Sequence, residues 1–349
     1  ICICDDASSS PATIAYLNEI QETDSRIKVN FSKHNQNISA ATNFAVELSE
    51  GEYLAFVDHD DLLTRTALYE VVKSINQFPD TNIIYSDQDK IDINGEISEP
   101  FYKPDWSPIY LESVMYIGHL LVVKKEIFYQ AGKMDSEFDG VQDYEFMLRV
   151  SEITSNVVHI PKILYHWRTL PGSIASDSAA KGKHIASLQV KAVNLHLKRL
   201  GLQATATINR SINVDHRTKL IPGSQEIYPL ISIVITTKDA PQHISRCLAS
   251  IFSETTYKNF EVIVVDNQTT DPDALRVMNE YPVKIVSFDE KFNYSKANNI
   301  GVENAAGKYI ILLNNDTEVI TPNWLETLLF YIERPDVGAV GPMLVYPDK

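Results

Sequence analysis

The chain has 349 residues, of which 44% are hydrophobic and 22% are charged, as in a globular protein long enough for two domains. Its net charge of −15 excludes a general nucleic-acid binder, because such a protein needs a basic face to displace counterions from phosphates. The three cysteines are too few for a disulfide framework and favour a reducing, cytoplasmic setting, and no apolar run is long enough to span a membrane.

The first predicted elements alternate between strands and helices. The chain opens inside an apolar strand, Ile1-Cys2-Ile3-Cys4, with no turn before it, so we expect a piece of a longer protein. Ser39 is the expected N-cap of the helix that follows. Apolar periodicity then predicts a helix over 39–49, a strand over 53–57, a helix over 66–77 and a strand over 82–85.

The remaining elements complete two α/β domains. Periodicity predicts a strand over 119–123, helices over 124–131, 143–151 and 185–200, and a buried strand over 230–235. Strands that alternate with helices indicate a mainly parallel sheet flanked by helices. We therefore expect a first domain over 1–208, a linker over 209–228 and a second domain over 229–349.

The two halves share an internal repeat. Residues 38–61 align with residues 294–317, and matched residues are 256 positions apart (299−43, 307−51 and 316−60). The matched pairs are Asn43 with Asn299, Gly51 with Gly307, and Asp60 with Asp316. The repeat predicts two tandem domains. Both are expected to be incomplete, because the first lacks its first strand and the second lacks its back half.

Acidic residues follow several predicted strands of the first half. The clusters are Asp5-Asp6, Asp58-His59-Asp60-Asp61 and Ser86-Asp87-Gln88-Asp89. Ligands of open parallel sheets bind beyond the carboxyl ends of the strands, and carboxylates that converge there repel one another unless a cation separates them. Oxygen ligands suit Mg²⁺ or Mn²⁺, which also bind diphosphates. A phosphorylated ligand with a metal is predicted, and the alternative is that these residues only cap helices and turns.

The ordered motifs make the chain resemble the family 2 glycosyltransferases, which have the GT-A fold. The first half carries CDDASSS, NISAATNFAVELSEGEYLAFVDHDD, YSDQDKID, FYKPDWSP, YIGHL, VQDYEFMLRV and HIPKILYHWRTLPGSIA. The second half carries ISIVITTKDAPQHISRCLASI, EVIVVDNQTTD and FNYSKANNIGVENAAGKYIILLNNDTEV. The resemblance covers most of residues 1–175 and most of the second half.

The resemblance implies roles for the residues of the donor site. Asp60 would be the direct metal ligand and Asp58 would face the ribose or a metal-bound water, whereas Asp61 is expected to cap the helix from Thr66. His166 would complete the metal shell, which suits Mn²⁺ better than Mg²⁺. The other implied donor contacts are Asp5, Asp6, Asn37 and Arg168.

The expected catalytic base is Asp143, which would take the proton of the acceptor hydroxyl. Glu145 is a competing candidate, and Asp143 could instead be a simple N-cap. The expected acceptor contacts are Trp106, Asp87 and Asp89. In the second half, Asp239 and Asp266 would contact the nucleotide and Asp316 the metal, and no base is visible there.

The resemblance implies a metal-dependent, inverting transfer of a sugar from a UDP or dTDP donor. The acceptor would be a growing glycan or a lipid-linked glycan of a bacterial surface polysaccharide, made at the inner face of the cell membrane with peripheral membrane association. The alternative is a nucleotide-sugar or glycan-binding module without its own catalysis. A dinucleotide oxidoreductase is disfavoured, because no Gly-x-Gly-x-x-Gly motif is present.

Overall fold

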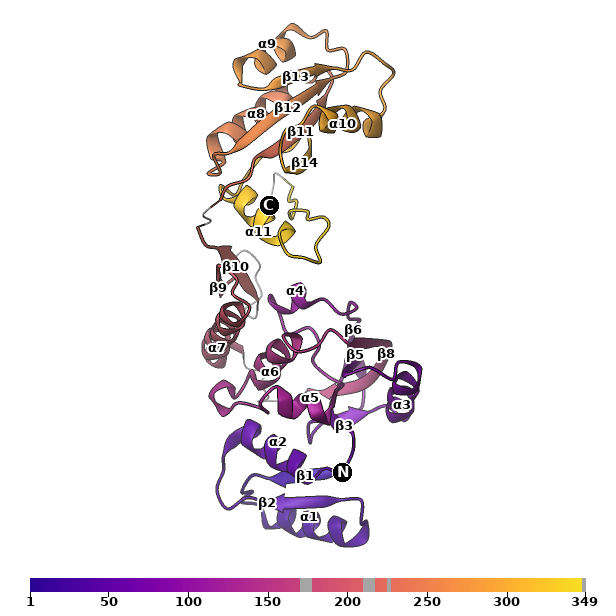
Figure 1. Ribbon diagram of the computed structural model, residues 1–349. Helices are drawn as coiled ribbons and strands as arrows, with labels where there is room; N and C mark the ends of the chain where they lie inside the picture. The colour runs from indigo at the N-terminus through magenta and orange to yellow at the C-terminus, as the bar shows by residue number, and fades with distance from the viewer. Residues whose placement is uncertain (170–177, 210–216, 225–226, 347–349) are drawn as a thin grey trace. The chain divides into compact units, whose positions relative to one another are not determined.

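The computed structural model describes residues 1–169, 178–209, 217–224 and 227–346. The chain divides into two compact units, unit 1 (Ile1–Ile221) and unit 2 (Pro222–Lys349), and the division falls inside the predicted linker (Figure 1). Both units contain strands covered by helices, so the α/β class is confirmed. No described helix combines the length and the apolar character needed to cross a membrane.

Unit 1 begins with a small parallel pair of strands. α1 (Pro11–Thr23) connects β1 (Cys2–Asp5) to β2 (Lys28–Phe31), and it starts with Ser10 as its N-cap followed by a proline. α2 (Asn37–Glu47) follows and packs on β1.

Ser39 does not cap α2, and this corrects the prediction. The helix starts two residues earlier, at Asn37, and Ser39 is buried within it. The Ser39 hydroxyl donates to the Asp139 carboxylate at 2.5 Å and lies 3.2 Å from the Asp135 carbonyl oxygen. These partners flank the 3₁₀ helix η1 (Ser136–Phe138). A polar residue that looked like a local cap therefore makes a long-range contact instead.

The larger sheet of unit 1 is mixed. Its strand order is β3-β7-β5-β8-β4, with β6 also paired to β5, and within it β5 and β8 are parallel while the other pairings are antiparallel. The strands are β3 (Tyr53–Phe56), β4 (Leu62–Leu63), β5 (Ile83–Ile91), β6 (Ile97–Phe101), β7 (Leu121–Lys124) and β8 (Val157–Arg168).

β5 is longer than its apolar residues indicate. β8 pairs with it from Ile83 to Ile91, and β6 pairs with its second half, so the strand continues well past Tyr85. Asp87 and Asp89 consequently lie inside a buried strand. The expectation that they follow a strand end was wrong, because neighbouring strands rather than local hydrophobicity decide where pairing stops.

Helices cover this sheet. α3 (Ala67–Gln77) packs Ala67 and Val71 on the same apolar cluster as Leu164 of β8. The other helices are α4 (Pro108–Leu111), α5 (Lys125–Gln130), α6 (Gln142–Ser151) and α7 (Ser178–Arg199).

A final pair of strands extends unit 1 beyond residue 208. β9 (Ala204–Ile208) pairs with β10 (Thr218–Pro222). The Thr218 hydroxyl donates to the Glu112 carbonyl oxygen at 2.5 Å, and the Thr218 N–H donates to the Ser113 carbonyl oxygen at 2.9 Å. These contacts attach the middle of the predicted linker to unit 1.

Unit 2 contains a parallel sheet in the order β13-β12-β11-β14. Along β11, Ile233 and Ile235 face one apolar cluster and Val234 faces the other, as expected for a strand buried on both faces. The strands are β11 (Ile231–Thr237), β12 (Phe260–Asp266), β13 (Lys284–Ser287) and β14 (Tyr309–Asn314). The helices are α8 (Pro241–Glu254), α9 (Pro272–Glu280), α10 (Tyr294–Glu303) and α11 (Trp324–Ile332).

The two units share one parallel pair of strands with a similar turn after it. β12 and β13 form a parallel pair, as do β1 and β2, and Asp266 and Asp5 each accept a hydrogen bond from the N–H three residues later, at 3.0 and 3.1 Å. In unit 2, β11 lies between β12 and β14. Among the described residues of unit 1, by contrast, β1 pairs only with β2 and β3 pairs only with β7.

Candidate active site

The acidic turn after β3 is held by two residues of β8. The Tyr165 hydroxyl accepts the Asp58 N–H at 3.2 Å and donates to Asp61 Oδ2 at 2.5 Å. Arg168 donates its N–H to Asp61 Oδ1 at 2.7 Å and its Nε–H to the Asp60 carbonyl oxygen at 2.5 Å. Burial raises the pKa of Asp61, and the hydrogen bonds from Tyr165 and Arg168 oppose that rise.

The sequence suggested that Asp61 caps the helix from Thr66, and this prediction was wrong. Both of its carboxylate oxygens accept hydrogen bonds from β8, and Thr66 itself is the N-cap residue of α3. Arg168, expected on the donor, binds the main chain of the same turn. The two residues fix the shape of the loop that presents Asp58 and Asp60.

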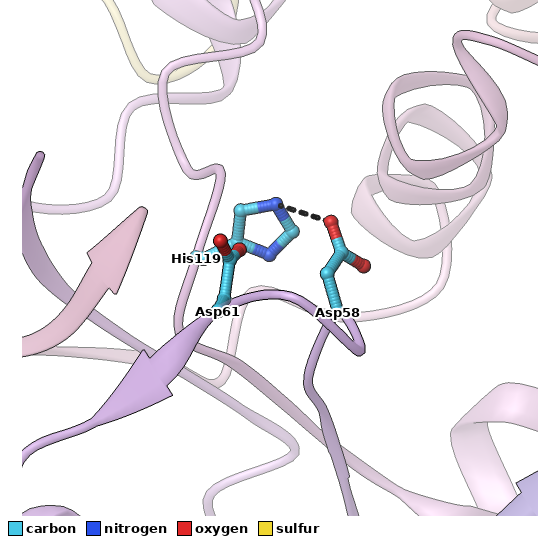
Figure 2. A group of neighbouring side chains, drawn as sticks. All are labelled: Asp58, Asp61 and His119. Atoms are coloured by element: carbon cyan, nitrogen blue, oxygen red, sulfur yellow. Dashed lines mark ion pairs between the residues drawn. The ribbon is translucent and has the colours of Figure 1, made fainter. Parts of the chain in front are cut away.

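His119 joins this turn from the loop before β7. Its ring stacks on Tyr165, with centroids 4.7 Å apart and an interplanar angle of 16°, and its Nε2 lies 3.6 Å from Asp58 Oδ2 (Figure 2). Its Nδ1 is buried and has no hydrogen-bond partner among the described residues. Sequence reasoning assigned His119 no role, although it lies in the motif YIGHL.

Asp58, Asp61 and His119 form a group that fits a divalent cation. Each offers one ligand atom, and these atoms lie within 4.8 Å of one another (Figure 2). Two carboxylates and one imidazole are a donor set that suits Mn²⁺.

Lys103 supports the loop that carries His119. The lysine is buried, and its ammonium group donates to the carbonyl oxygens of Ser86 (2.6 Å), Ile117 (2.5 Å) and His119, and to Gln88 Oε1 (3.0 Å). Burial lowers the pKa of Lys103 to about 7, and the charge of Asp87 opposes this fall. The sequence signal was the lysine inside the motif FYKPDWSP, but its partners come from two other segments, β5 and the loop before β7.

Asp143 lies in the first turn of α6, and the charges of His119 and Asp58 influence the pKa of its carboxyl group. Burial raises the pKa of its carboxyl group, the charge of His119 opposes the rise, and the charge of Asp58 adds to it. Val141 is the N-cap residue of α6, so Asp143 does not have the simple capping role that was the alternative. Its Oδ1 accepts the N–H of Tyr144 at 2.8 Å.

Glu145, the competing candidate for the base, is committed to an ion pair. Its side chain is 3% exposed, and Glu145 Oε2 lies 2.6 Å from Arg149 Nη2. The same guanidinium donates to the Lys133 carbonyl oxygen at 2.8 Å. A carboxylate bound in this way is poorly placed to accept a substrate proton, so the geometry favours Asp143.

The expected acceptor residues Asp87 and Asp89 pair with histidines of β8. Asp87 Oδ1 lies 2.9 Å from His159 Nε2 and accepts the Lys103 N–H at 2.9 Å. Asp89 Oδ1 lies 2.5 Å from His166 Nδ1. The structure thus brings His166 to Asp89, its partner in the β5–β8 register, and not to Asp60. Trp106, the third expected acceptor residue, is partly buried after β6.

The expected nucleotide contacts at the N-terminus lie close together. The Asp6 carboxylate accepts the N–H groups of Gln36 (2.9 Å) and Asn37 (2.8 Å), where Asn37 has a positive φ of 67°. Asp5 Oδ2 accepts the Ser8 N–H at 3.1 Å. Asp5, Asp6 and Asn37 therefore shape one loop at the end of β1.

Unit 2 has a cavity of about 410 Å³ at the corresponding strand ends. Asp316 lines it together with Asn314, Asn315 and Lys238. Asp239 accepts the N–H groups of Thr270 and Asp271, which lower the pKa of its carboxyl group. Asp266 accepts the Thr269 N–H. Asp316 thus faces the cavity, whereas Asp239 and Asp266 both bind main-chain N–H groups of the loop that follows β12.

The motif order and the site geometry agree with one family of proteins. The family model described as "Glycosyl transferase family 2" matches residues 1–132 and 232–349. The chain belongs to glycosyl transferase family 2. This confirms the resemblance that the sequence motifs indicated, and the matched stretches include β1 to α5 and β11 to α11 of this glycosyltransferase chain.

Several curated relatives of this glycosyltransferase are much longer than the chain. It is 37% identical over 351 residues to the O-antigen biosynthesis protein RfbC of Myxococcus xanthus, covering 99% of this chain and 27% of that protein. It is 37% identical over 355 residues to the uncharacterized protein y4gI of Sinorhizobium fredii, covering 100% of this chain and 39% of that protein. A chondroitin synthase of Escherichia coli is 30% identical over 207 residues, or 58% of this chain and 29% of that protein.

Proposed function

We propose that unit 1 transfers a sugar from a nucleotide-diphosphate donor to a glycan acceptor, with inversion at the anomeric carbon and with a divalent cation. The observation that carries this proposal is the arrangement of Asp58, His119 and Asp143, in which a partly buried carboxyl group with a raised pKa lies in the electrostatic field of the group that fits a cation. Such a constellation provides a base and a place for a diphosphate together.

Asp143 acts as the base in this reaction. It takes the proton of the acceptor hydroxyl as the hydroxyl oxygen attacks the anomeric carbon from the face opposite the nucleotide. The bond between the anomeric carbon and the diphosphate oxygen breaks, and the nucleoside diphosphate leaves with the electron pair. The raised pKa of Asp143 suits this role, because an ordinary aspartate with a pKa of about 3.9 is a weak base.

We assign the cation to Asp58 and His119, which belong to the converging group, and to Asp60, the ligand that the motif implied in the same turn. Asp61, the third member of that group, is left out because both of its carboxylate oxygens already accept hydrogen bonds from β8. His119 replaces His166 in the assignment because His166 is paired with Asp89. Asp61 remains the residue that holds the turn. A bound Mn²⁺ or Mg²⁺ would neutralise the charge of the departing diphosphate.

The remaining donor contacts follow the strand ends. We propose that Asp5, Asp6 and Asn37 contact the base and ribose of a UDP-type or dTDP-type nucleotide, because they shape one loop at the end of β1. Arg168 would bind the diphosphate through the part of its guanidinium that does not bind the Asp60 carbonyl.

We propose that unit 2 is a second copy with its own donor site. The separate match of residues 232–349 to the family model and the cavity lined by Asp316 support this proposal. Asp316 would be the metal ligand there, with Asp239 and Asp266 in the loops that contact the nucleotide. The name of the Myxococcus relative, an O-antigen biosynthesis protein, supports a role in bacterial surface polysaccharide synthesis, which we propose takes place at the inner face of the membrane.

The decisive experiment measures hydrolysis of a panel of UDP-sugars and dTDP-sugars by the purified chain with Mn²⁺. We expect turnover that EDTA abolishes and Mn²⁺ restores, and a loss of at least about 100-fold in Asp60→Ala. Asp80→Asn, an exposed aspartate on the turn after α3, is the control. Donor binding without any turnover would leave the binding module as the function, and no donor binding at all would reject the proposal.

The choice between His119 and His166 needs a separate readout. Mn²⁺ binding followed by electron paramagnetic resonance should weaken by about tenfold or more in His119→Ala, because one ligand is lost. His34→Ala, an exposed histidine, serves as the control. A loss of Mn²⁺ affinity in His166→Ala and none in His119→Ala would return the assignment to His166.

A further inference from the structure

The loop that carries His119 bends around a buried ammonium group. Lys103 is 6% exposed, and its Nζ donates to the carbonyl oxygens of both Ile117 and His119. The other two acceptors belong to β5, and they are the Ser86 carbonyl oxygen at 2.6 Å and Gln88 Oε1 at 3.0 Å. Three ammonium hydrogens therefore meet four oxygens, which offsets the cost of burying the charge.

Gly118 allows the loop to take this shape. Its φ of +48° lies in the left-handed region that favours glycine. A Cβ at this position would lie 2.7 Å from Gln88 Oε1, so the glutamine occupies the space that a side chain would need. The same oxygen accepts the His119 N–H at 3.0 Å. The N–H and the carbonyl oxygen of His119 are therefore both bound, the first by Gln88 and the second by Lys103.

The main chain and the ring of His119 are fixed by different neighbours. The ring stacks on Tyr165, and its Nε2 lies 3.6 Å from Asp58 Oδ2 (Figure 2). Stacking restricts the tilt of the ring, but the place of the ring along the stack depends on the main chain that carries it. A ligand whose position is fixed before the ion arrives binds that ion more tightly. The contacts of Lys103 and Gln88 therefore bear on the cation, although neither side chain belongs to the group that fits it.

Lys103 is itself anchored to β5. Its main-chain N–H donates to Asp87 Oδ1 at 2.9 Å, and Asp87 Oδ1 also lies 2.9 Å from His159 Nε2. Asp87 is 3% exposed, so the carboxylate that was expected to contact the acceptor instead holds the segment that carries Lys103. Because β5 binds the main chain of Lys103 at Asp87 and its ammonium group at Ser86, the lysine is a firm support for the loop.

We propose that Lys103 is a positioning residue of the cation site, whose ammonium group, together with Gln88 and Gly118, holds the main chain of His119 so that the imidazole meets the cation. This inference rests on the proposed function, because that function assigns His119 to the cation. It deepens the assignment by naming the residues that keep the ligand in place. Lys103 acts through His119 and binds neither the donor nor the ion.

The test measures the Mn²⁺ affinity of the full chain by electron paramagnetic resonance. Lys103→Met keeps a side chain of similar length and removes the ammonium group, so we expect the Mn²⁺ dissociation constant to rise about tenfold or more. Lys125→Met is the matched control, because the Lys125 ammonium group donates to the Ser49 carbonyl oxygen at 2.6 Å, away from this loop. The control should leave the Mn²⁺ affinity unchanged.

A pair of glycine variants keeps the test decisive if Lys103→Met does not fold. Gly118→Ala would press its new methyl group against Gln88, whereas Gly95→Ala, at a φ of +84°, has nothing within 4 Å of its methyl group. Both changes strain the main chain, but only the first displaces a group that binds His119. We expect Gly118→Ala to weaken Mn²⁺ binding and Gly95→Ala to leave it unchanged. Equal weakening in the two variants would contradict the role of Gln88 and Gly118.

A double-mutant cycle distinguishes positioning from a general loosening of the fold. In a His119→Ala background, Lys103→Met should cause no further loss of Mn²⁺ affinity, because the lysine acts through the histidine that is already missing. A second loss as large as the first would overturn the inference. Folded Lys103→Met and Gly118→Ala variants that bind Mn²⁺ as tightly as the wild type would overturn it as well.

The wild type separates this inference from the function on which it rests. A wild-type chain that binds no Mn²⁺ would reject the cation site itself, and the positioning role with it. Mn²⁺ binding and donor hydrolysis by the wild type, with no effect of either variant on the affinity, would reject the positioning role alone.

Discussion

Replacing Tyr165 with phenylalanine removes the hydroxyl that holds the acidic turn and keeps the ring that stacks on His119. That hydroxyl donates to the buried Asp61 carboxylate at 2.5 Å and accepts the Asp58 N–H at 3.2 Å. A buried hydrogen bond to a charged group contributes about 1.5–3 kcal/mol, so we expect the free energy of unfolding to fall by this amount. Donor hydrolysis should fall as well, because Asp58 loses its fixed position.

Tyr85 provides a closely matched control within the same sheet. It too is fully buried, it stacks on a histidine with ring centroids 4.7 Å apart, and its hydroxyl donates to the neutral Pro104 carbonyl oxygen at 2.6 Å. Tyr85→Phe should cost about 0.5–1.5 kcal/mol, the usual value for a neutral acceptor, and should leave donor hydrolysis unchanged.

The assay is urea unfolding at several pH values. Burial raises the pKa of Asp61, and the loss of the Tyr165 hydrogen bond would raise it further. An acid with a raised folded-state pKa binds more protons folded than unfolded, so its contribution to stability is lost as pH rises from the unfolded pKa through the folded one. The deficit of Tyr165→Phe should therefore grow as the pH rises above the ordinary aspartate pKa of about 3.9.

Two results would refute this reasoning. The first is a deficit of Tyr165→Phe that does not exceed that of Tyr85→Phe at neutral pH, since the charged acceptor would then add nothing. The second is a deficit independent of pH, because Asp61 would not be the acceptor that matters.

Three further changes test the assignment of the base. Asp143→Asn should lower the turnover number about 10²–10⁴-fold with little change in donor affinity, measured against Asp80→Asn. The acid limb of the activity profile should lie above the ordinary aspartate pKa, because protonated Asp143 cannot accept a proton. His119→Ala should move this limb to higher pH, since the charge of His119 lowers the pKa of Asp143; an unmoved limb would contradict this charge effect. Glu145→Gln should lower the free energy of unfolding by about 3–5 kcal/mol, because it removes the charge that pairs with Arg149, and it should leave the acid limb in place. A shifted acid limb would make Glu145 the base.

The sequence predicted the element order well and the polar contacts poorly. The helices at α3 and α6 start within one residue of their predicted positions, because apolar periodicity is local. Ser39 and Asp61 were both read as caps, and both instead bind residues 100 or more positions away. A short polar side chain near a helix start looks the same in sequence whether its partner is local or distant.

The sequence by itself determined the family, the repeat and the positions of the acidic residues, because these depend on residue types at fixed spacings along the chain. Only the tertiary structure decided which histidine meets which acid. Asp89 meets His166 because β5 and β8 pair in one register, and Asp58 meets His119 because β7 lies between β3 and β5. Strand order and register arise from packing between distant segments, so spacing along the chain cannot reveal them.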